Sequence, residues 1–115
     1  MIEVLSTSRC TECDICVRVC PTNVFDAVPG SHPVIARKED CQTCFMCELY
    51  CPVDALFVAP QADQSATVQE EQLASSEQLG SYRAAIGWGP GRTSSASRDQ
   101  SYRLLIAPPG PRTGR

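Results

Sequence analysis

The sequence predicts an α+β domain made of two βαβ halves related by pseudo-two-fold symmetry, followed by a mostly irregular C-terminal arm. Three observations support this fold class. All eight cysteines of the 115 residues lie between Cys10 and Cys51. They form two runs with the same internal spacing, and short apolar segments flank both runs. Two copies of one pattern at a fixed offset indicate a duplicated structural unit.

The repeat comprises CTECDICVRVCP at residues 10–21 and CQTCFMCELYCP at residues 41–52. Each copy reads C-x2-C-x2-C-x3-C-P, and the offset is 31 residues at every cysteine. With only two copies, we interpret the repeat as one pseudosymmetric domain over residues 1–60 and not as an extended array.

Short apolar runs predict the strands. Residues 2–5 (IEVL) alternate weakly and predict a strand that pairs with residues 56–59 (LFVA), which joins the two ends of the domain. Residues 24–28 and 34–36 flank Pro-Gly-Ser-His-Pro at 29–33, and this turn chemistry predicts a hairpin.

The helices are predicted within the cysteine runs. Residues 14–19 and 45–50 each suit a short helix, and Pro21 and Pro52 end them because proline cannot continue a helix. The apolar residues around the runs are predicted to cover the metal centres; they are Val19, Val24, Phe25, Val34, Ile35, Leu49, Val53, Leu56 and Phe57.

The cysteine positions favour metal ligands over disulfides. The N-terminal residues lack the charged and apolar regions of a secretory signal, and no stretch approaches the ~18 apolar residues of a membrane span. We therefore expect a reducing cytoplasm, where clustered cysteines bind metals. The alternative is a disulfide-rich secreted domain.

Charge is distributed unevenly along the chain. Residues 1–60 carry four basic and eight acidic side chains. Residues 61–79 carry four acidic side chains and no basic one, and residues 80–115 carry six basic side chains and one acidic one. The local net charges are therefore −4, −4 and +5, which sum to −3. The six arginines are scattered and form no dense basic run, so nucleic-acid binding is not predicted.

The spacing predicts two [4Fe–4S] clusters. Iron–sulfur clusters are held by cysteine thiolates, and in two-cluster proteins with this run the fourth cysteine ligates the other cluster. We expect one cluster on Cys10, Cys13, Cys16 and Cys51, and the other on Cys41, Cys44, Cys47 and Cys20. A zinc-stabilised interaction module is an alternative of another class, since Cys-x-x-Cys pairs also bind zinc. Four zinc ligands would leave the matching third and fourth cysteines unexplained.

Residues 1–60 resemble the dicluster bacterial-type ferredoxins, and CVRVCPTNVFDAVP at 16–29 is similar to the iron–sulfur subunit of photosystem I. The resemblance implies a ferredoxin-like (βαβ)2 fold and low-potential one-electron centres close enough for intramolecular transfer. Members of the family often have glycine after the second cysteine, where this chain has Asp14 and Phe45.

The two cysteine loops differ in charge. The first contains Glu12 and Asp14, whereas Gln42-Thr43 and Phe45-Met46 in the second are uncharged. Reduction adds negative charge, which nearby carboxylates oppose, so the cluster at Cys41–Cys47 is predicted to have the higher potential. No catalytic constellation or phosphate loop is present in the sequence, and the lone His32 lies in a turn. We expect no catalytic site in this chain.

Residues 61–115 are predicted to form a partner-binding arm with one possible short helix. Thr67 and Glu70 fit a capping box, which predicts a helix over residues 68–79 that ends at Gly80. Two aromatic–basic–aliphatic hexads, SYRAAI at 81–86 and SYRLLI at 101–106, follow. Tyr, Trp and Arg are enriched at interface hot spots, so residues 80–106 are predicted to order on a partner. The proline-rich residues 107–111 are not expected to be helical.

The arm is similar in architecture to those of iron–sulfur subunits of flavoprotein oxidoreductases. This resemblance implies a hetero-oligomer in which the clusters relay single electrons to or from a catalytic subunit, with FAD in that partner and not in this chain. The alternative is a freestanding, diffusible ferredoxin with a disordered tail.

Overall fold

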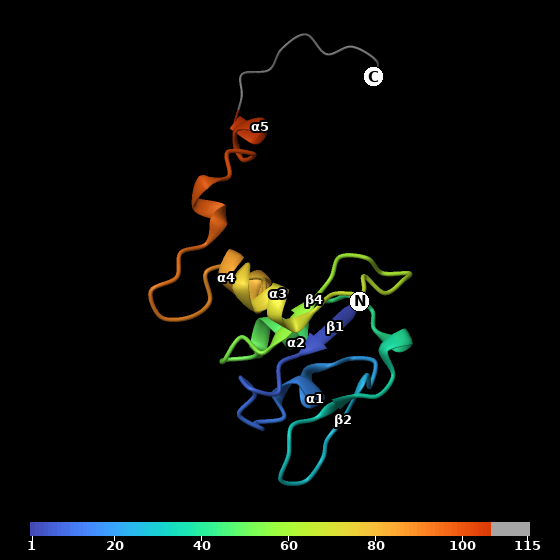
Figure 1. Cartoon of the computed structure of the whole chain (residues 1–115). Coiled ribbons are helices and arrows are strands. Elements are labelled where there is room, and N and C mark those ends of the chain that lie inside the picture. The colour runs from blue at the N-terminus through green and yellow to red at the C-terminus, as the bar shows by residue number, and fades with distance from the viewer. Residues whose placement is uncertain (107–115) are drawn as a thin grey trace.

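The computed structural model describes residues 1–106, which form a small α+β body and a projecting C-terminal arm (Figure 1). The predicted irregular end at residues 107–111 lies outside the described residues. Within residues 1–106, no helix is both long and apolar enough to cross a bilayer.

The two ends of the body meet in one sheet. Strand β1 (Ile2–Leu5) pairs antiparallel with β4 (Leu56–Val58), as the sequence predicts. Val4 lies opposite Phe57 and Ile2 opposite Val58, so Glu3 forms a bulge between two paired positions. A bulge redirects a side chain relative to the regular pleat, and here the Glu3 side chain is 2% exposed.

The second sheet is the predicted hairpin, reduced to its minimum. Strand β2 (Phe25–Asp26) pairs antiparallel with β3 (Val34–Ile35), and the turn between them passes through Gly30 at φ 71°. Phe25 and Val24 are buried, whereas Val34 is exposed. The expectation that Val34 covers a metal centre is therefore wrong, because successive strand residues point to opposite faces of a sheet.

Two short helices lie inside the cysteine runs and pack against each other. They are α1 (Ile15–Val19) and α2 (Met46–Tyr50), and each stops one residue before the last cysteine of its run. Both follow a non-glycine residue in the left-handed region, Asp14 at φ 58° and Phe45 at φ 62°. The body is therefore a small α+β unit with two antiparallel sheets, consistent with a ferredoxin-like fold.

The arm is more ordered than the sequence predicts. Residues 70–106 contain three α-helices, α3 (Glu70–Ser75), α4 (Ser81–Ala85) and α5 (Arg103–Ile106), and a 3-10 turn, η2 (Ser95–Arg98). The expectation of one possible helix is therefore wrong. Hydrogen bonds to the body satisfy backbone groups at the start of α4. The helix propensity of a short segment does not include such tertiary contacts.

The predicted helix over residues 68–79 is also wrong in extent. Thr67 lies at φ 49° and does not cap α3, which starts after Gln69 without a side-chain cap. Glu77 and Gly80 both adopt positive φ, and Gly80 precedes α4 and does not simply end a helix. The chain turns there because Leu73 and Leu79 are both buried.

A carboxylate links β1 to the start of the arm. Glu3 Oε1 accepts hydrogen bonds from Lys38 Nζ and from Ser65 Oγ (2.9 Å), and its Oε2 accepts one from Ala66 N (2.7 Å). Burial acts to raise the pKa of Glu3, but these hydrogen bonds outweigh it and lower the pKa below its usual value. Lys38 belongs to the 3-10 turn η1 (Lys38–Asp40), so three chain segments meet at this carboxylate.

We predict that Glu3→Gln destabilises the protein by about 1–3 kcal/mol, because a buried carboxylate with several donors is replaced by an amide that cannot accept them all. A carboxylate with a depressed pKa stabilises the folded state above the ordinary pKa of about 4.3 and loses that effect as pH falls through the lowered value. The difference in denaturant midpoint from the unmodified protein should therefore stay constant from about pH 8 to pH 5. Glu39→Gln, at an exposed residue of the same turn, is the control. A difference that fades between pH 7 and pH 5 would contradict this assignment.

Candidate metal-cluster site

Two cavities divide the eight cysteines into two sets of four. The first is lined by Cys10, Cys13, Cys16 and Cys51. The second is lined by Cys41, Cys44, Cys47 and Cys20. Each cavity thus meets the first three cysteines of one run and the last cysteine of the other run. We call these cavities the first site and the second site.

The folding of the body explains this exchange of cysteines. Cys20 and Cys51 each lie just beyond a helix, α1 or α2, and those two helices pack against each other. The end of each helix therefore lies near the loop of the opposite run. Apolar side chains complete both cavities; they include Ile2, Val24, Phe25 and Val58 in the second site and Leu5, Ile15, Val53 and Leu56 in the first.

Backbone N–H groups point at the cysteine sulfurs. In the first site, Glu12 N donates to Cys10 Sγ (3.4 Å) and Ala55 N donates to Cys51 Sγ (3.3 Å). Such bonds favour the charged thiolate over the neutral thiol.

The second site has the matching donors and one more. Thr43 N and Val24 N donate to Cys41 Sγ and Cys20 Sγ, both at 3.4 Å, and Ile2 N also donates to Cys41 Sγ (3.3 Å). The Ile2 contact comes from β1, which lies 39 residues before Cys41, and no local sequence signal indicates it.

Left-handed backbone residues aim these donors. Positive φ occurs at Glu12, Asp14 and Asn23, and again 31 residues later at Thr43, Phe45 and Asp54. Each such residue in a non-glycine position costs about 1–2 kcal/mol. The same strained conformation occurs beside the same cysteine positions of both runs. It directs the N–H group of Glu12 toward Cys10 Sγ and that of Thr43 toward Cys41 Sγ. The sequence shows no glycine here, so this conformation could not be predicted from residue type.

Burial makes the third cysteine of each run a poor thiolate by itself. Burial raises the pKa of Cys16 to about 12 and also raises the pKa of Cys47. At Cys20, burial acts in the same direction, but hydrogen bonds with Val24 N and with Thr22 outweigh it and lower the pKa. Buried thiolates therefore require a nearby cation, and metal binding releases the thiol protons.

The donor set fits iron–sulfur clusters. All eight cysteines lie within the described residues and are free of disulfides. In residues 1–106, no three His, Cys, Asp or Glu side chains converge closely enough to hold a single metal ion. The cysteines instead line two hollows whose other walls are mostly apolar. A polynuclear centre with thiolate ligands on separate metal atoms suits this arrangement better than one tetrahedral ion does.

Comparison with known proteins gives the same chemistry. The family model described as a 4Fe-4S dicluster domain matches residues 9–56. A ferredoxin of Methanocaldococcus jannaschii that is itself uncharacterised is 41% identical over 63 residues, which is 53% of this chain and the whole of that relative. A ferredoxin of Methanothermococcus thermolithotrophicus is 43% identical over 47 residues, or 41% of this chain and 77% of the relative.

A further relative is the ferredoxin-type protein NapF of Escherichia coli K12. It is 33% identical over 51 residues, which is 44% of this chain but 30% of NapF. The family match ends at residue 56, so the comparison supports the body and leaves the arm untested. The 4Fe-4S description decides against zinc as the bound metal.

We predict that the centre in the second site has the higher reduction potential. Asp14 lines the first site, whereas the residues that line the second site are uncharged apart from the cysteines. The second site also has three backbone donors to sulfur and the first has two among the described residues, and such bonds stabilise the more negative reduced state. Redox titration monitored by EPR should show two midpoints, and replacing a second-site cysteine should remove the more positive one. Loss of the more negative midpoint instead would show that charge and hydrogen bonding do not set the order.

Proposed function

This chain belongs to the ferredoxins with a 4Fe-4S dicluster domain, and from that premise we propose that it is the iron–sulfur subunit of a larger oxidoreductase, which relays single electrons to or from a flavin-containing catalytic subunit. The chain binds two [4Fe–4S] clusters and functions in electron transfer. The clusters supply the one-electron chemistry, and the protein holds them, excludes water and donates hydrogen bonds to the sulfurs.

The ligand sets of this proposal are those that line the two cavities. Cys10, Cys13, Cys16 and Cys51 hold one cluster, and Cys41, Cys44, Cys47 and Cys20 hold the other. The supporting observation is that each cavity meets the last cysteine of the opposite run. We place the protein in the cytoplasm because all eight cysteines serve as thiolate ligands and none forms a disulfide.

We predict that serine substitutions pair across the runs. Cys20→Ser should alter the same EPR signal and midpoint as Cys44→Ser, and Cys51→Ser should alter the same centre as Cys13→Ser. The untouched centre should keep its midpoint in each variant. If Cys20→Ser instead alters the same centre as Cys13→Ser, each run serves its own cluster and the exchange of ligands is refuted.

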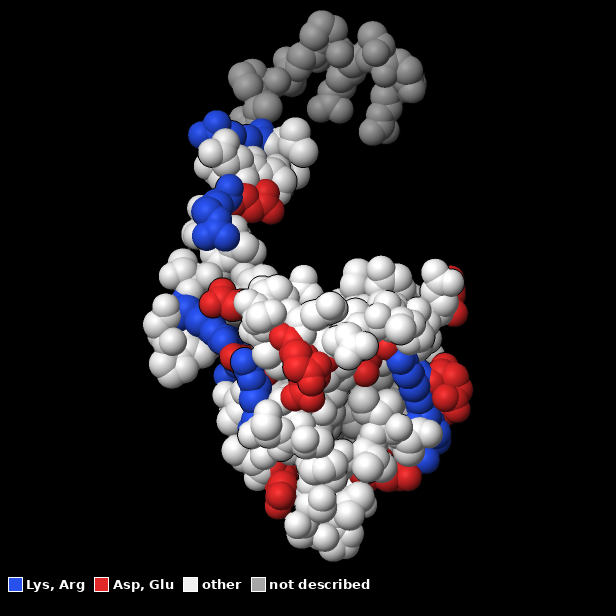
Figure 2. All heavy atoms as spheres, viewed as in Figure 1, with Lys and Arg blue, Asp and Glu red and all other residues white. Residues whose placement is uncertain are grey.

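The proposal of a partner is supported by the exposed side chains at the projecting end of the arm. Tyr102, Leu104 and Leu105 are 55%, 84% and 88% exposed, and Arg103 lies among them on α5. Figure 2 shows basic side chains with acidic atoms beside them on this projecting part, whereas the body carries many acidic groups mixed with basic ones. Exposed apolar side chains grouped with aromatic and arginine residues are typical of protein interaction sites.

We therefore assign partner binding to residues 80–106, with the exposed contacts concentrated at residues 101–105. The flavin of the catalytic subunit is proposed from the architectural resemblance of the arm, with FAD in the partner. The division at residue 60 into a cluster domain and a partner-binding arm is part of the same proposal. Hydrogen bonds cross that division, including the one from the N-terminal amine to Gln61 O (2.8 Å).

One observation favours a second candidate, a freestanding ferredoxin. The match to the Methanocaldococcus jannaschii ferredoxin spans that relative's whole length, so a protein of the size of this body exists without an arm of this kind. Size-exclusion chromatography of the native protein separates the two candidates. Co-elution with a flavin-containing chain supports the subunit, and a solitary monomer supports the freestanding ferredoxin.

We predict that the double substitution Leu104→Asp and Leu105→Asp releases the partner and leaves the clusters intact. Both leucines are exposed, so charge there should disrupt an apolar interface without unfolding the body. The readouts are partner recovery in a pull-down and iron content of the purified chain. Val28→Asp, at an exposed apolar residue before the hairpin turn, is the matched control. Full partner recovery with the double variant would remove α5 from the interface.

A further inference from the structure

Glu48 departs from the repeat and is fully buried. The matching position of the first run is Val17, and both lie directly after the third cysteine. Glu48 is 0% exposed, yet its carboxylate is satisfied, because Oε1 accepts from Val58 N (2.8 Å) and Oε2 accepts from Tyr82 N (2.5 Å). A buried carboxylate is tolerated only with such partners. Glu48 therefore joins α2 to β4 and to the first turn of α4.

The bonds of Glu48 satisfy groups that would otherwise be orphaned. The first N–H groups of a helix lack partners within that helix, and Gly80 has no side chain with which to cap α4. Gly80 N itself donates to Leu56 O (2.9 Å) on the outer edge of β4. Arg83 Nη1 donates to Leu49 O (2.7 Å) near the end of α2. The arm and the segment from α2 to β4 thus satisfy each other's backbone groups, through the side chains of Glu48 and Arg83 and one direct backbone bond.

Aromatic packing connects α4 to the second site. Phe45 lines the second site and is held at φ 62°, an uncommon conformation for a bulky residue. The Tyr82 ring stacks on Phe45 with centroids 4.7 Å apart and planes at 27°. Trp88 meets Tyr50 edge to face at 5.4 Å. The matching residues of the first run are Asp14 and Val19, which have no aromatic rings.

We propose that residues 79–92 form a clasp over the second site, which fixes Phe45 against the cluster there and limits the access of water to it. Glu48 is the positioning residue, because it orients α4 through Tyr82 N. The clasp acts on one of the two clusters and makes their surroundings unequal. This inference depends on a cluster beside Cys41, Cys44 and Cys47, and it does not require a flavoprotein partner.

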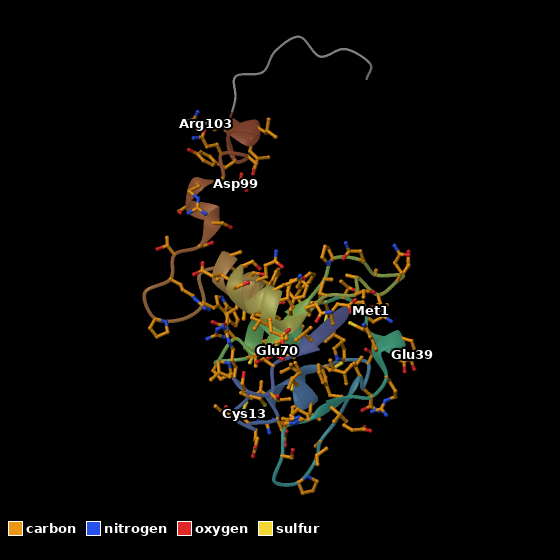
Figure 3. All side chains as sticks on the ribbon, viewed as in Figure 1. Met1, Cys13, Glu39, Glu70, Asp99 and Arg103 are labelled. Carbon is orange, nitrogen blue, oxygen red and sulfur yellow. The ribbon has the colours of Figure 1, made fainter. Side chains whose placement is uncertain are left out.

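The clasp has a direct electrostatic consequence. Reduction makes the cluster and its four thiolates more negative, and an apolar cover disfavours the more highly charged state. Opening the clasp should therefore shift the midpoint of the second-site cluster to a more positive potential. It should also speed the loss of that cluster in air, because water and oxygen reach it more easily. The first-site cluster should keep its midpoint, since Phe45, the residue on which Tyr82 stacks, lines the second site and not the first. Figure 3 shows Cys13 of the first site on a loop well away from Arg103 on α5.

Gly80 offers a way to open the clasp without changing a residue of either site. A Cβ at Gly80 would lie 2.3 Å from Asp54 Oδ1, and Gly80 also has φ +70°. Gly80→Ala should therefore push the start of α4 away from Asp54, which lies between α2 and β4. Gly30→Ala is the matched control, because Gly30 lies outside the clasp and has φ +71°, and a Cβ there meets no atom within 4 Å. Both variants place an alanine at nearly the same positive φ, so the backbone strain is similar. A difference between their midpoints therefore reports the steric contact of residue 80 with Asp54.

A second pair of variants tests the aromatic contact. Tyr82→Ala should reproduce the effect of Gly80→Ala, and Tyr82→Phe, which keeps the stacked ring, should restore the original midpoint. Tyr102→Ala is the control, since Tyr102 is exposed and forms no aromatic pair within residues 1–106.

The measurement is an EPR-monitored titration of the full chain, with the rate of bleaching in air as an independent readout. The second-site centre is identified as the one lost in Cys44→Ser. This identification holds whether or not Cys20 is a ligand of the cluster on the opposite run. Support is an upward shift of that midpoint alone, together with several-fold faster bleaching of about half of the cluster absorbance. Equal changes at both centres, or no change at either, overturn the clasp. The flavoprotein proposal is tested separately, because it fails if the native protein does not co-elute with a flavin-containing chain.

Discussion

The structure depends on keeping eight cysteine sulfurs negatively charged inside a very small body. Burial opposes that charge, as the raised pKa values of Cys16 and Cys47 show. Two contributions offset burial. Iron supplies positive charge, and backbone N–H groups donate to Cys10, Cys20, Cys41 and Cys51. The sheets and helices are short because they need only present these loops to two metal centres.

Strained backbone is part of the same arrangement. Six non-glycine residues with positive φ occur in matched pairs 31 residues apart, around the cysteines of both runs. Metal binding is coupled to folding, so the free energy of cluster binding can hold conformations that an isolated loop would not adopt. A body of about 60 residues has a small hydrophobic core, which makes this coupling important for stability. The clusters are therefore structural as well as functional.

The two halves share a pattern but not an environment. Glu48 stands where the repeat has Val17, and Phe45 stands where it has Asp14. Both departures are explained by the arm, which satisfies the Glu48 carboxylate and stacks Tyr82 on Phe45. Duplication alone would give two similar centres, and the arm gives the two clusters different surroundings. An electron carrier with two centres can use such a difference to direct electrons, because the potential of each centre depends on charge and solvent exposure.

The cysteine spacing, the apolar segments and the prolines were sufficient to predict both cluster loops, all four strands and the helices of the body. These features depend on contacts close in sequence or on a repeat that is visible in it. The arm was predicted poorly. The capping box at Thr67 was wrong, and the structured contacts of Tyr82, Arg83 and Trp88 with the body were missed. Those contacts join residues 34 or more positions apart, and Glu48 is the one sequence signal that could have indicated them. The sequence by itself determined which atoms bind metal, because ligand chemistry resides in residue type and spacing. The spacing also predicted which sulfurs share a site, and the packing of α1 on α2 brings those sulfurs to one cavity. Only the tertiary structure decided which site the arm covers, because packing of α4 on α2 depends on contacts between residues far apart in the chain.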